Sequence, residues 1–291
     1  MSFLGLPPVD ISEADALILP LPLEMTVSYG TGTRGGPQAI LDASRQIELF
    51  DEETLVNFAE RPKIHTLPPL APPQAAEDLP ACLETVRQHV VPLAEKFLVS
   101  LGGEHTITYG VATGLVEDLS ELTIVQIDAH ADLADQLGGR RWSHGTVMRR
   151  LWDRGCRLVQ IGIRSLSRAE YDLAQSDGRI TTFYAHQLAG RWGEVLAELA
   201  GLKGKVYLTI DVDGLDPAVI PSTGTPQPGG LAWSQMMDVL RAIARAPRCR
   251  WVGSDVVELV PSPNPPGCDP AAARLVMKVL AHWWAARGEG R

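Results

Sequence analysis

Two clusters of potential metal ligands each follow an apolar segment of the chain. Asp128-Ala129-His130-Ala131-Asp132 comes directly after Leu122–Ile127, and Asp211-Val212-Asp213 comes directly after Val206–Ile210. Such short apolar runs are typical of buried strands, so five potential ligands are expected at the carboxyl ends of two strands. In open α/β sheets, ligands bind at that edge. The spacing Asp-x-His-x-Asp also lets the first, third and fifth side chains converge on one side of an extended backbone.

The chemistry of these side chains favours hard divalent cations. Four of the five are carboxylates, which repel one another and raise one another's pKa values unless cations keep them ionised. Carboxylate-rich sites with some imidazole suit Mn²⁺ and Mg²⁺, whereas structural zinc sites are rich in thiolates. One such cluster alone could be an acidic, solvated loop. Two clusters, each ending a predicted strand, favour a metal site.

A third segment brings a further imidazole to the same predicted edge. Gly102-Gly103-Glu104-His105 follows the predicted strand Phe97–Leu101 and precedes a helical stretch. The two glycines allow the backbone to turn sharply after the strand. We therefore expect His105 to be a metal ligand beside the two aspartate clusters. Glu104 is expected to have a supporting or structural role.

The elements that must position these residues form an α/β pattern. Short apolar runs alternate with helical stretches, which predicts a mostly parallel sheet covered by helices on both faces. With 291 residues the chain can bury a large core, and we expect one domain over residues 1–291. In chain order, the predicted strands are Ala16–Leu19, Phe97–Leu101, Leu122–Ile127, Leu158–Ile163, Val206–Ile210 and Trp251–Val257.

Capping residues predict where three of the helices begin. Ser167 is expected to cap a helix over Arg168–Gln175, and Ser234 is expected to cap a helix over Gln235–Arg245. Asp269-Pro270 is expected to open a final helix with proline at its first position. The apolar residues of that last helix recur every three to four positions, so we expect them to face the core.

Composition and charge disfavour several classes of protein. The formal net charge of −9 argues against a nucleic acid partner, which requires basic patches, and is compatible with a cationic substrate. We expect no membrane association, because no apolar run approaches the length of a membrane span and the start has no signal-like segment. The four cysteines are far apart and form no C-x-x-C pair, which favours free thiols in a reducing cytoplasm.

The ordered set of motifs resembles the ureohydrolases, the family of arginases and agmatinases. The three ligand-bearing segments look like the three signature motifs of that family. Four further segments match family segments in the same order: Tyr29–Pro37, Ser143–Thr146, Thr223–Gly230 and Asp255–Glu258. The resemblance covers essentially the whole chain, and it implies an arginase-like fold with three α/β/α layers.

The same resemblance implies a binuclear manganese centre with two Mn²⁺ ions per subunit. Asp128 and Asp211 would bridge the ions, with His105 and Asp132 completing one site and His130 and Asp213 the other. A hydroxide between the ions would be the nucleophile, because two divalent cations lower the pKa of a shared water. Asp132 is also placed to accept the hydrogen bond of that hydroxide. The implied ligands are His105, Asp128, His130, Asp132, Asp211 and Asp213.

Three further residues receive roles in binding and catalysis from the resemblance. Glu258 would clamp the substrate, since a carboxylate matches the fork of a guanidinium group. His144 would bind near the substrate and act as a proton shuttle, taking a proton from the hydroxide and delivering it to the leaving amine. Thr225 is expected to line the substrate channel. Four ionised aspartates and two divalent ions cancel in charge, so the hydroxide and Glu258 leave a net negative site that favours a guanidinium cation.

The loop after the Asp-x-His-x-Asp motif bears on which guanidino compound is hydrolysed. Arginases recognise the α-carboxylate and α-amine with Ser and Asn residues there, whereas Leu133–Ser143 contains no Asn. We therefore expect an agmatinase, which converts agmatine and water to putrescine and urea in polyamine biosynthesis. Asp135 could meet the cationic tail of the substrate.

Alternatives to the agmatinase interpretation remain open. The same catalytic core would hydrolyse N1-aminopropylagmatine to spermidine and urea. Guanidinobutyrate becomes the favoured substrate if Arg140 and Arg141 face the channel. A deacetylase-like amidohydrolase with a single zinc is disfavoured, because that lineage does not need His105, Asp132 and Asp213 together as ligands. A non-catalytic regulator is disfavoured because no ligand, shuttle or clamp position is lost. The family also implies a homo-oligomer, either a trimer or a hexamer.

Overall fold

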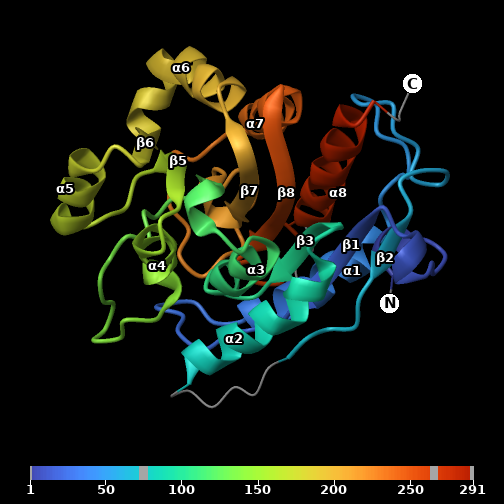
Figure 1. The fold of residues 1–291 in the computed structure, drawn as a ribbon, viewed down its shortest axis with the longest axis horizontal. Helices are drawn as coiled ribbons and strands as arrows, with labels where there is room; N and C mark the ends of the chain where they lie inside the picture. The colour runs from blue at the N-terminus through green and yellow to red at the C-terminus, as the bar shows by residue number, and fades with distance from the viewer. Residues whose placement is uncertain (1, 72–77, 263–267, 289–291) are drawn as a thin grey trace.

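The computed structural model describes residues 2–71, 78–262 and 268–288, and within them eight parallel strands form one central sheet (Figure 1). The strand order across the sheet is β2-β1-β3-β8-β7-β4-β5-β6, and every neighbouring pair is parallel. The strands are β1 (Ala16–Leu21), β2 (Ile64–Thr66), β3 (Phe97–Gly102), β4 (Leu122–Ile127), β5 (Arg157–Ile163), β6 (Ile180–Tyr184), β7 (Lys203–Asp211) and β8 (Arg248–Val257).

Helices cover both faces of this sheet (Figure 1). One face packs against α1 (Gly36–Ser44), α6 (Leu188–Ala200), α7 (Trp233–Arg245) and α8 (Cys268–Ala286). The other face packs against α2 (Leu79–Val90), α3 (Ile107–Leu115), α4 (Val147–Asp153) and α5 (Arg168–Ser176). The structure therefore confirms the predicted three-layer α/β/α arrangement around a parallel sheet.

Burial on both faces explains why the strands are unbroken apolar runs in the sequence. In β1, Ile18 contributes to the core beside α1 and α8, whereas Leu17 and Leu19 contribute to the core beside α2 and α3. All six residues of β1 are buried. Alternate side chains of a strand point to opposite faces, so a strand covered on both sides is apolar at every position.

The six predicted strands are all present, and two short strands were not predicted. β2 has three residues and lies at one edge of the sheet, where few side chains need to be apolar. β6 lies at the other edge, and its residues Thr181 and Thr182 are only partly buried. Both strands therefore lack the continuous apolar pattern that identified the central ones.

The predicted helix starts are confirmed at one position and wrong at another. Ser167 caps α5 by accepting a hydrogen bond from Glu170 N, as expected. Ser234 does not cap α7, because that helix begins one residue earlier, at Trp233, and its N-cap is Ala232. The Gln235 side chain accepts a hydrogen bond from Ala232 N at 2.9 Å. The final helix begins at Cys268, slightly before the predicted proline, and its apolar side chains are buried as expected.

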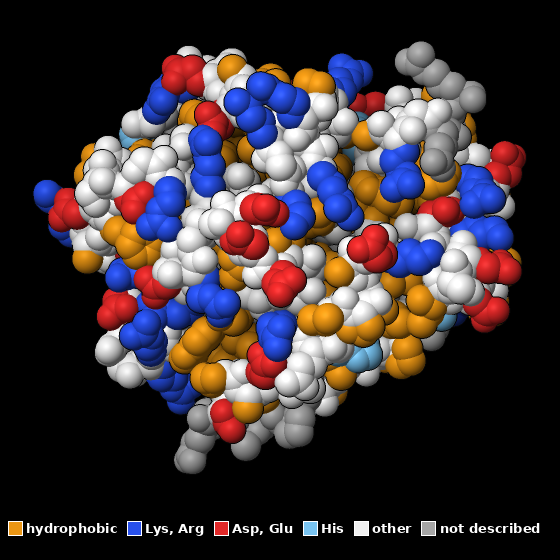
Figure 2. All heavy atoms as spheres, in the orientation of Figure 1, with side chains coloured by type: hydrophobic (Ala, Val, Ile, Leu, Met, Phe, Trp, Pro, Cys, Tyr) orange, Lys and Arg blue, Asp and Glu red, His pale blue; other side chains and the backbone are white. Residues whose placement is uncertain are grey.

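The surface charges, the helices and the cysteines bear on the expectations from composition. Acidic and basic side chains are interspersed on the face drawn in Figure 2, and neither sign of charge forms a continuous field there. No helix among the described residues has the length and apolar character needed to cross a membrane. All four cysteines belong to the described part of the chain, and none forms a disulfide.

Candidate metal centre

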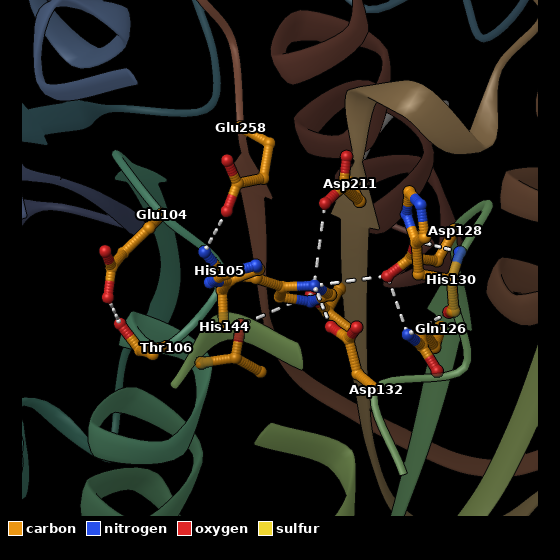
Figure 3. A network of polar contacts seen from close by, with 12 residues as sticks. Glu104, His105, Thr106, Gln126, Asp128, His130, Asp132, His144, Asp211 and Glu258 are labelled. Atoms are coloured by element: carbon orange, nitrogen blue, oxygen red, sulfur yellow. Dashed lines mark hydrogen bonds and ion pairs between the residues drawn. The ribbon is translucent and has the colours of Figure 1, made fainter. Parts of the chain in front are cut away.

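The carboxyl ends of four adjacent central strands bring the predicted ligands together (Figure 3). The strands β3, β8, β7 and β4 are consecutive in the sheet, and His105, Glu258, Asp211 and Asp128 lie at or just beyond their ends. Two sets of side chains could each hold an ion, with donor atoms within 4.8 Å of one another. The first donor group is His105, Asp128 and Asp132, and the second donor group is Asp128, His130 and Asp213.

The first donor group surrounds a buried imidazole nitrogen with carboxylates. His105 Nδ1 lies 3.0 Å from Asp132 Oδ2 and 3.2 Å from Asp128 Oδ2. Asp211 Oδ2 lies 3.6 Å from the same nitrogen. The His105 side chain is only 1% exposed, and its Nδ1 forms no hydrogen bond within the described structure. A buried nitrogen without a hydrogen bond, facing three carboxylates, fits the ligand set of a divalent cation.

The second donor group shares Asp128 with the first. His130 Nδ1 lies 3.1 Å from Asp213 Oδ2 and 3.7 Å from Asp128 Oδ1. Asp128 therefore directs one oxygen toward each imidazole, which is the arrangement expected of a bridging carboxylate. Asp211 faces His105, and its Oδ1 accepts a hydrogen bond from Asp213 N at 2.9 Å. A bridging role for Asp211 stays a prediction.

The pKa values of the buried site residues indicate that the site requires positive charge. Burial and the neighbouring charge of Asp128 raise the pKa of the Asp132 carboxyl to about 7. Burial also raises the pKa of Asp211 well above its usual range, with repulsion from Asp213 adding to it. Burial opposes protonation of His130, but the neighbouring carboxylates of Asp128 and Asp213 outweigh burial and raise its pKa to about 11. Divalent cations would relieve this repulsion and keep the carboxylates ionised.

A buried network behind the site fixes the orientation of His105. The Thr209 hydroxyl donates to Asp255 Oδ1 at 2.6 Å, so it must accept the 2.8 Å hydrogen bond from His105 Nε2. The proton of the neutral imidazole is thereby placed on Nε2, and the lone pair of Nδ1 faces the carboxylates. Tyr207 and Thr108 also donate to Asp255, which is fully buried. Metal-ligating histidines are held in this way by groups behind them.

Glu258 lies at the end of β8 and lines the cavity above the two donor groups. Its backbone has a positive φ of 64°, and its N–H donates to Gly103 O at 2.8 Å. Its Oε1 accepts a hydrogen bond from His105 N at 2.7 Å. Burial raises the pKa of this carboxyl well above its usual range, with the charge of Glu104 adding to it. A bound guanidinium cation would favour the ionised form.

His144 lies at the start of a short 3₁₀ helix (His144–Thr146) and also lines the cavity. Its Nδ1 lies 3.2 Å from Thr26 Oγ1, and its Nε2 lies 2.8 Å from Ser28 Oγ. Burial lowers the pKa of this imidazole, with the charge of Glu104 acting in the opposite direction. A neutral imidazole at the cavity wall is able to accept a proton near neutral pH.

The cavity over the site has a volume of about 310 Å³, and none of the described residues that line it is Lys or Arg. Thr225 also lines the cavity, and its Oγ1 lies 3.3 Å from Asp213 Oδ2. Ser165, Leu166 and Glu170 also line the cavity. A cavity lined by carboxylates and neutral groups suits a cationic ligand.

Three residues of the loop Leu133–Ser143 lie away from the cavity lining. Asp135 forms an ion pair with Arg150 at 2.9 Å, so its position gives no support to the prediction that it meets a substrate tail. Arg141 lies 3.6 Å from Asp153, and Arg140 reaches the carbonyl of Met25 at 3.5 Å. The condition that favoured guanidinobutyrate is therefore not met in this structure.

Comparisons with known proteins agree with this geometry. The model of the Arginase family matches residues 14–282. An N(1)-aminopropylagmatine ureohydrolase from Synechocystis sp. is 36% identical over 280 residues, which cover 94% of this chain and 90% of the relative. An agmatinase from Halalkalibacterium halodurans is 32% identical over 283 residues, 93% of each chain. The solved agmatine ureohydrolase of Thermoplasma volcanium has a TM-score of 0.82 and 26% identity, covering 97% of this chain and 94% of that chain.

Proposed function

This chain belongs to the arginase family, and we propose that it hydrolyses a decarboxylated guanidino amine to urea and a polyamine, with two Mn²⁺ ions per chain. Within the family it is a ureohydrolase of the agmatinase and aminopropylagmatine ureohydrolase type. The observation that carries the proposal is a cavity that combines two carboxylate–imidazole donor groups with a wall free of Lys and Arg among the described residues.

The bound cations would supply hydroxide near neutral pH by lowering the pKa of a shared water. Glu258 would bind the guanidinium group, because a buried carboxylate accepts charge-assisted hydrogen bonds from its N–H groups. His144 would take up a proton from the attacking water and release it to the departing amine. Both side chains line the same cavity as His105 and Asp132, so substrate, base and donor groups would share one cavity.

We favour N1-aminopropylagmatine as the better substrate, with agmatine as the second candidate. The similarity to the Synechocystis enzyme extends over 94% of the chain and is higher than that to the agmatinase described above. The cavity lining also includes Glu170, a largely buried carboxylate whose oxygens accept hydrogen bonds from Leu133 N and Ser167 N, and whose negative charge suits the ammonium groups of a longer cationic tail. This reverses the order expected from sequence alone, where the catalytic core could not distinguish the two substrates.

An α-carboxylate is not expected to bind well in this cavity. Burying a charged group without a partner costs several kcal/mol, and leaving even a hydrogen-bonding group unsatisfied costs about 1–3 kcal/mol. Each ~1.4 kcal/mol changes kcat/KM by about tenfold. Arginine and guanidinobutyrate should therefore be hydrolysed at least about tenfold less efficiently than the decarboxylated amines.

The test is release of urea by the Mn²⁺-loaded protein from agmatine, N1-aminopropylagmatine, arginine and guanidinobutyrate. We expect the highest kcat/KM with N1-aminopropylagmatine. A higher value for agmatine would make the protein an agmatinase. Equal efficiency with arginine would overturn the proposed substrate class, and a preference for guanidinobutyrate would show that Arg140 or Arg141 reaches the channel.

The proposed setting is the cytoplasm, where thiols remain reduced. None of the four cysteines, all of which are described, forms a disulfide. Disulfides are rare in that compartment, so this chain needs no oxidising environment to reach the described structure.

A further inference from the structure

The hydroxyl of Thr26 connects His144 to the buried carboxylate of Glu104. Thr26 Oγ1 lies 3.2 Å from His144 Nδ1 and donates to Glu104 Oε1 at 3.0 Å. The same hydroxyl accepts a hydrogen bond from His144 N at 3.0 Å. Glu104 is fully buried, and Figure 3 places it and His144 on the same side of the site. The Glu104 carboxylate therefore acts on the His144 imidazole through the Thr26 side chain alone.

The hydrogen bonds from His144 through Thr26 to Glu104 determine the tautomer of His144. A threonine hydroxyl has one hydrogen and two lone pairs. Its hydrogen is used on Glu104, and one lone pair accepts from His144 N. The remaining lone pair can only accept, so Nδ1 of the neutral imidazole must be protonated. The lone pair of the imidazole then lies on Nε2, where Ser28 Oγ lies 2.8 Å away at the cavity wall.

We propose that Thr26, oriented by Glu104, is a positioning residue that fixes Nε2 of His144 as the nitrogen that exchanges protons with the reactants. The inference rests on the proposed role of His144 as proton shuttle. The arrangement follows the logic of a catalytic triad, in which a buried carboxylate holds one imidazole nitrogen protonated so that the other is the base. Here a hydroxyl stands between the carboxylate and the imidazole.

The segment that carries Thr26 is held firmly enough for this role. Glu104 Oε2 accepts hydrogen bonds from both Met25 N and Thr26 N at 2.6 Å. Further along the segment, Gly30 N donates to Gly224 O at 3.2 Å. A Cβ added at Gly30 would lie only 2.8 Å from Gly224 Cα, so the two backbones are in close contact. Thr26 is thus fixed by its own backbone as well as by its side chain.

Replacing the hydroxyl without changing the shape of the side chain tests the proposal. Thr26→Val should lower kcat by about tenfold or more. General acid–base groups contribute roughly 10²–10⁴-fold to the rate, and His144 with its proton on the wrong nitrogen would lose part of that contribution. KM and the Mn²⁺ content should stay close to those of the wild type. Thr26→Ser, which keeps the hydroxyl, should restore most of the turnover. Thr85→Val is the matched control, because Thr85 is an exposed threonine on α2 that bonds only to its own helix.

A spectroscopic measurement separates this proposal from the proposed function. Long-range ¹H–¹⁵N correlation of protein loaded with diamagnetic Mg²⁺ reports which nitrogen of each histidine is protonated, and His144→Gln assigns the signal. We expect Nδ1–H for His144 in the wild type and loss of this preference in Thr26→Val. If no guanidino substrate releases urea, the proposed function fails while the tautomer is still measured. An unchanged tautomer in Thr26→Val, or equal loss of turnover in Thr26→Ser, would overturn the proposal.

Discussion

Two residues of the site have backbone angles that side-chain-bearing residues rarely adopt. Asp132 has a φ of 53° and Glu258 a φ of 64°. Such conformations cost on the order of 1–3 kcal/mol each and persist where the surrounding contacts determine them. Asp132 O accepts from Arg149 N at 3.0 Å, and Glu258 N donates to Gly103 O. These backbone angles therefore direct the Asp132 carboxylate to the first donor group and the Glu258 carboxylate to the cavity.

The network behind His105 supports a prediction about metal binding. Thr209→Val keeps the shape of the side chain but removes the acceptor for His105 Nε2–H, so the imidazole loses its fixed orientation. We expect the ion at the first donor group to bind about 10–100-fold more weakly. The second donor group does not contain His105, and its ion should bind as in the wild type. Mn²⁺ titration followed by electron paramagnetic resonance measures both affinities.

Thr123→Val provides the control for this titration. Thr123 lies in β4, is largely buried like Thr209, and is remote from both donor groups along the strand. Its replacement should leave both Mn²⁺ affinities unchanged. Unaltered binding of both ions in Thr209→Val would mean that the hydroxyl does not orient His105.

The sequence identified the members of the two donor groups better than the residues that support them. Carboxylates and imidazoles directly after apolar strands are conspicuous, because charged residues are rarely buried without a partner or a metal. Thr26 and Thr209 carry no such signal, since threonine is a common residue in strands and loops. Their roles depend on contacts with residues about eighty and forty-six positions away in the chain, at Glu104 and Asp255. A local pattern contains no information about such pairs.

At the scale of elements, glycines allow the strand ends to approach one another. The Gly102-Gly103 pair was expected to provide a sharp turn, yet neither residue has a positive φ. A Cβ at Gly103 would lie 2.0 Å from Leu23 O, so this glycine makes room for the segment after β1. At Gly214 a Cβ would lie 2.5 Å from Asp128 N. Both glycines therefore permit backbone contacts next to the donor groups.

A buried ion pair joins α8 to the segment after α1. Lys278 Nζ lies 2.7 Å from Asp51 Oδ2, and the two side chains are 3% and 0% exposed. Lys278 also lies 3.0 Å from Glu52, whose side chain is largely exposed. Removing one partner of a buried pair leaves the other charge uncompensated. The acidic run at residues 51–53 resembles an ordinary solvated loop, so the sequence did not indicate this contact.

Lys278→Met should lower the free energy of unfolding by about 3–5 kcal/mol, because Asp51 would remain buried without its cation. Asp51→Asn should cost less, since Lys278 keeps Glu52 as a partner. Urea unfolding of the Mn²⁺-loaded protein, followed by circular dichroism, measures both. Equal stability of Lys278→Met and wild type would show that the pair does not stabilise the fold.

The pH dependence of this pair has a definite sign. Burial opposes ionisation of Asp51, but its hydrogen bond to Lys278 and those to Thr54 outweigh burial and lower its pKa. A lowered folded-state pKa contributes stability that is present above the unfolded value of about 4 and is lost as pH falls through the folded value. The difference between wild type and Asp51→Asn should therefore shrink below about pH 4.

At the scale of the whole molecule, one edge of the sheet concentrates the negative charge of the site. The central strands β3, β8, β7 and β4 direct their carboxyl ends to one place, so negative charge is concentrated there. Elsewhere, on the face shown in Figure 2, the two signs of charge are mixed. The net charge of −9 is thus accompanied by a locally acidic site that attracts cations.

Metal content tests this view of the molecule. The two donor groups predict close to two equivalents of Mn²⁺ per chain, whereas a saturating value near one would favour the deacetylase-like alternative with a single zinc. Asp128 belongs to both groups, so Asp128→Asn should weaken both ions. Asp213 belongs only to the second group, so Asp213→Asn is the matched variant that should weaken one. Elemental analysis after gel filtration in defined free Mn²⁺ distinguishes the three proteins.

Removal of the ions should also destabilise the fold, because their binding relieves repulsion among buried aspartates. A ligand that binds only the folded state stabilises it by about 2.7 kcal/mol at one hundred times its Kd. Chelation with EDTA should therefore lower the midpoint of thermal unfolding, and added Mn²⁺ should restore it in proportion to the logarithm of its free concentration. Asp128→Asn should respond least, since it removes one carboxylate from the shared position of both donor groups. The same response to chelation in Asp128→Asn and wild type would mean that the stabilising ions bind somewhere other than these two groups.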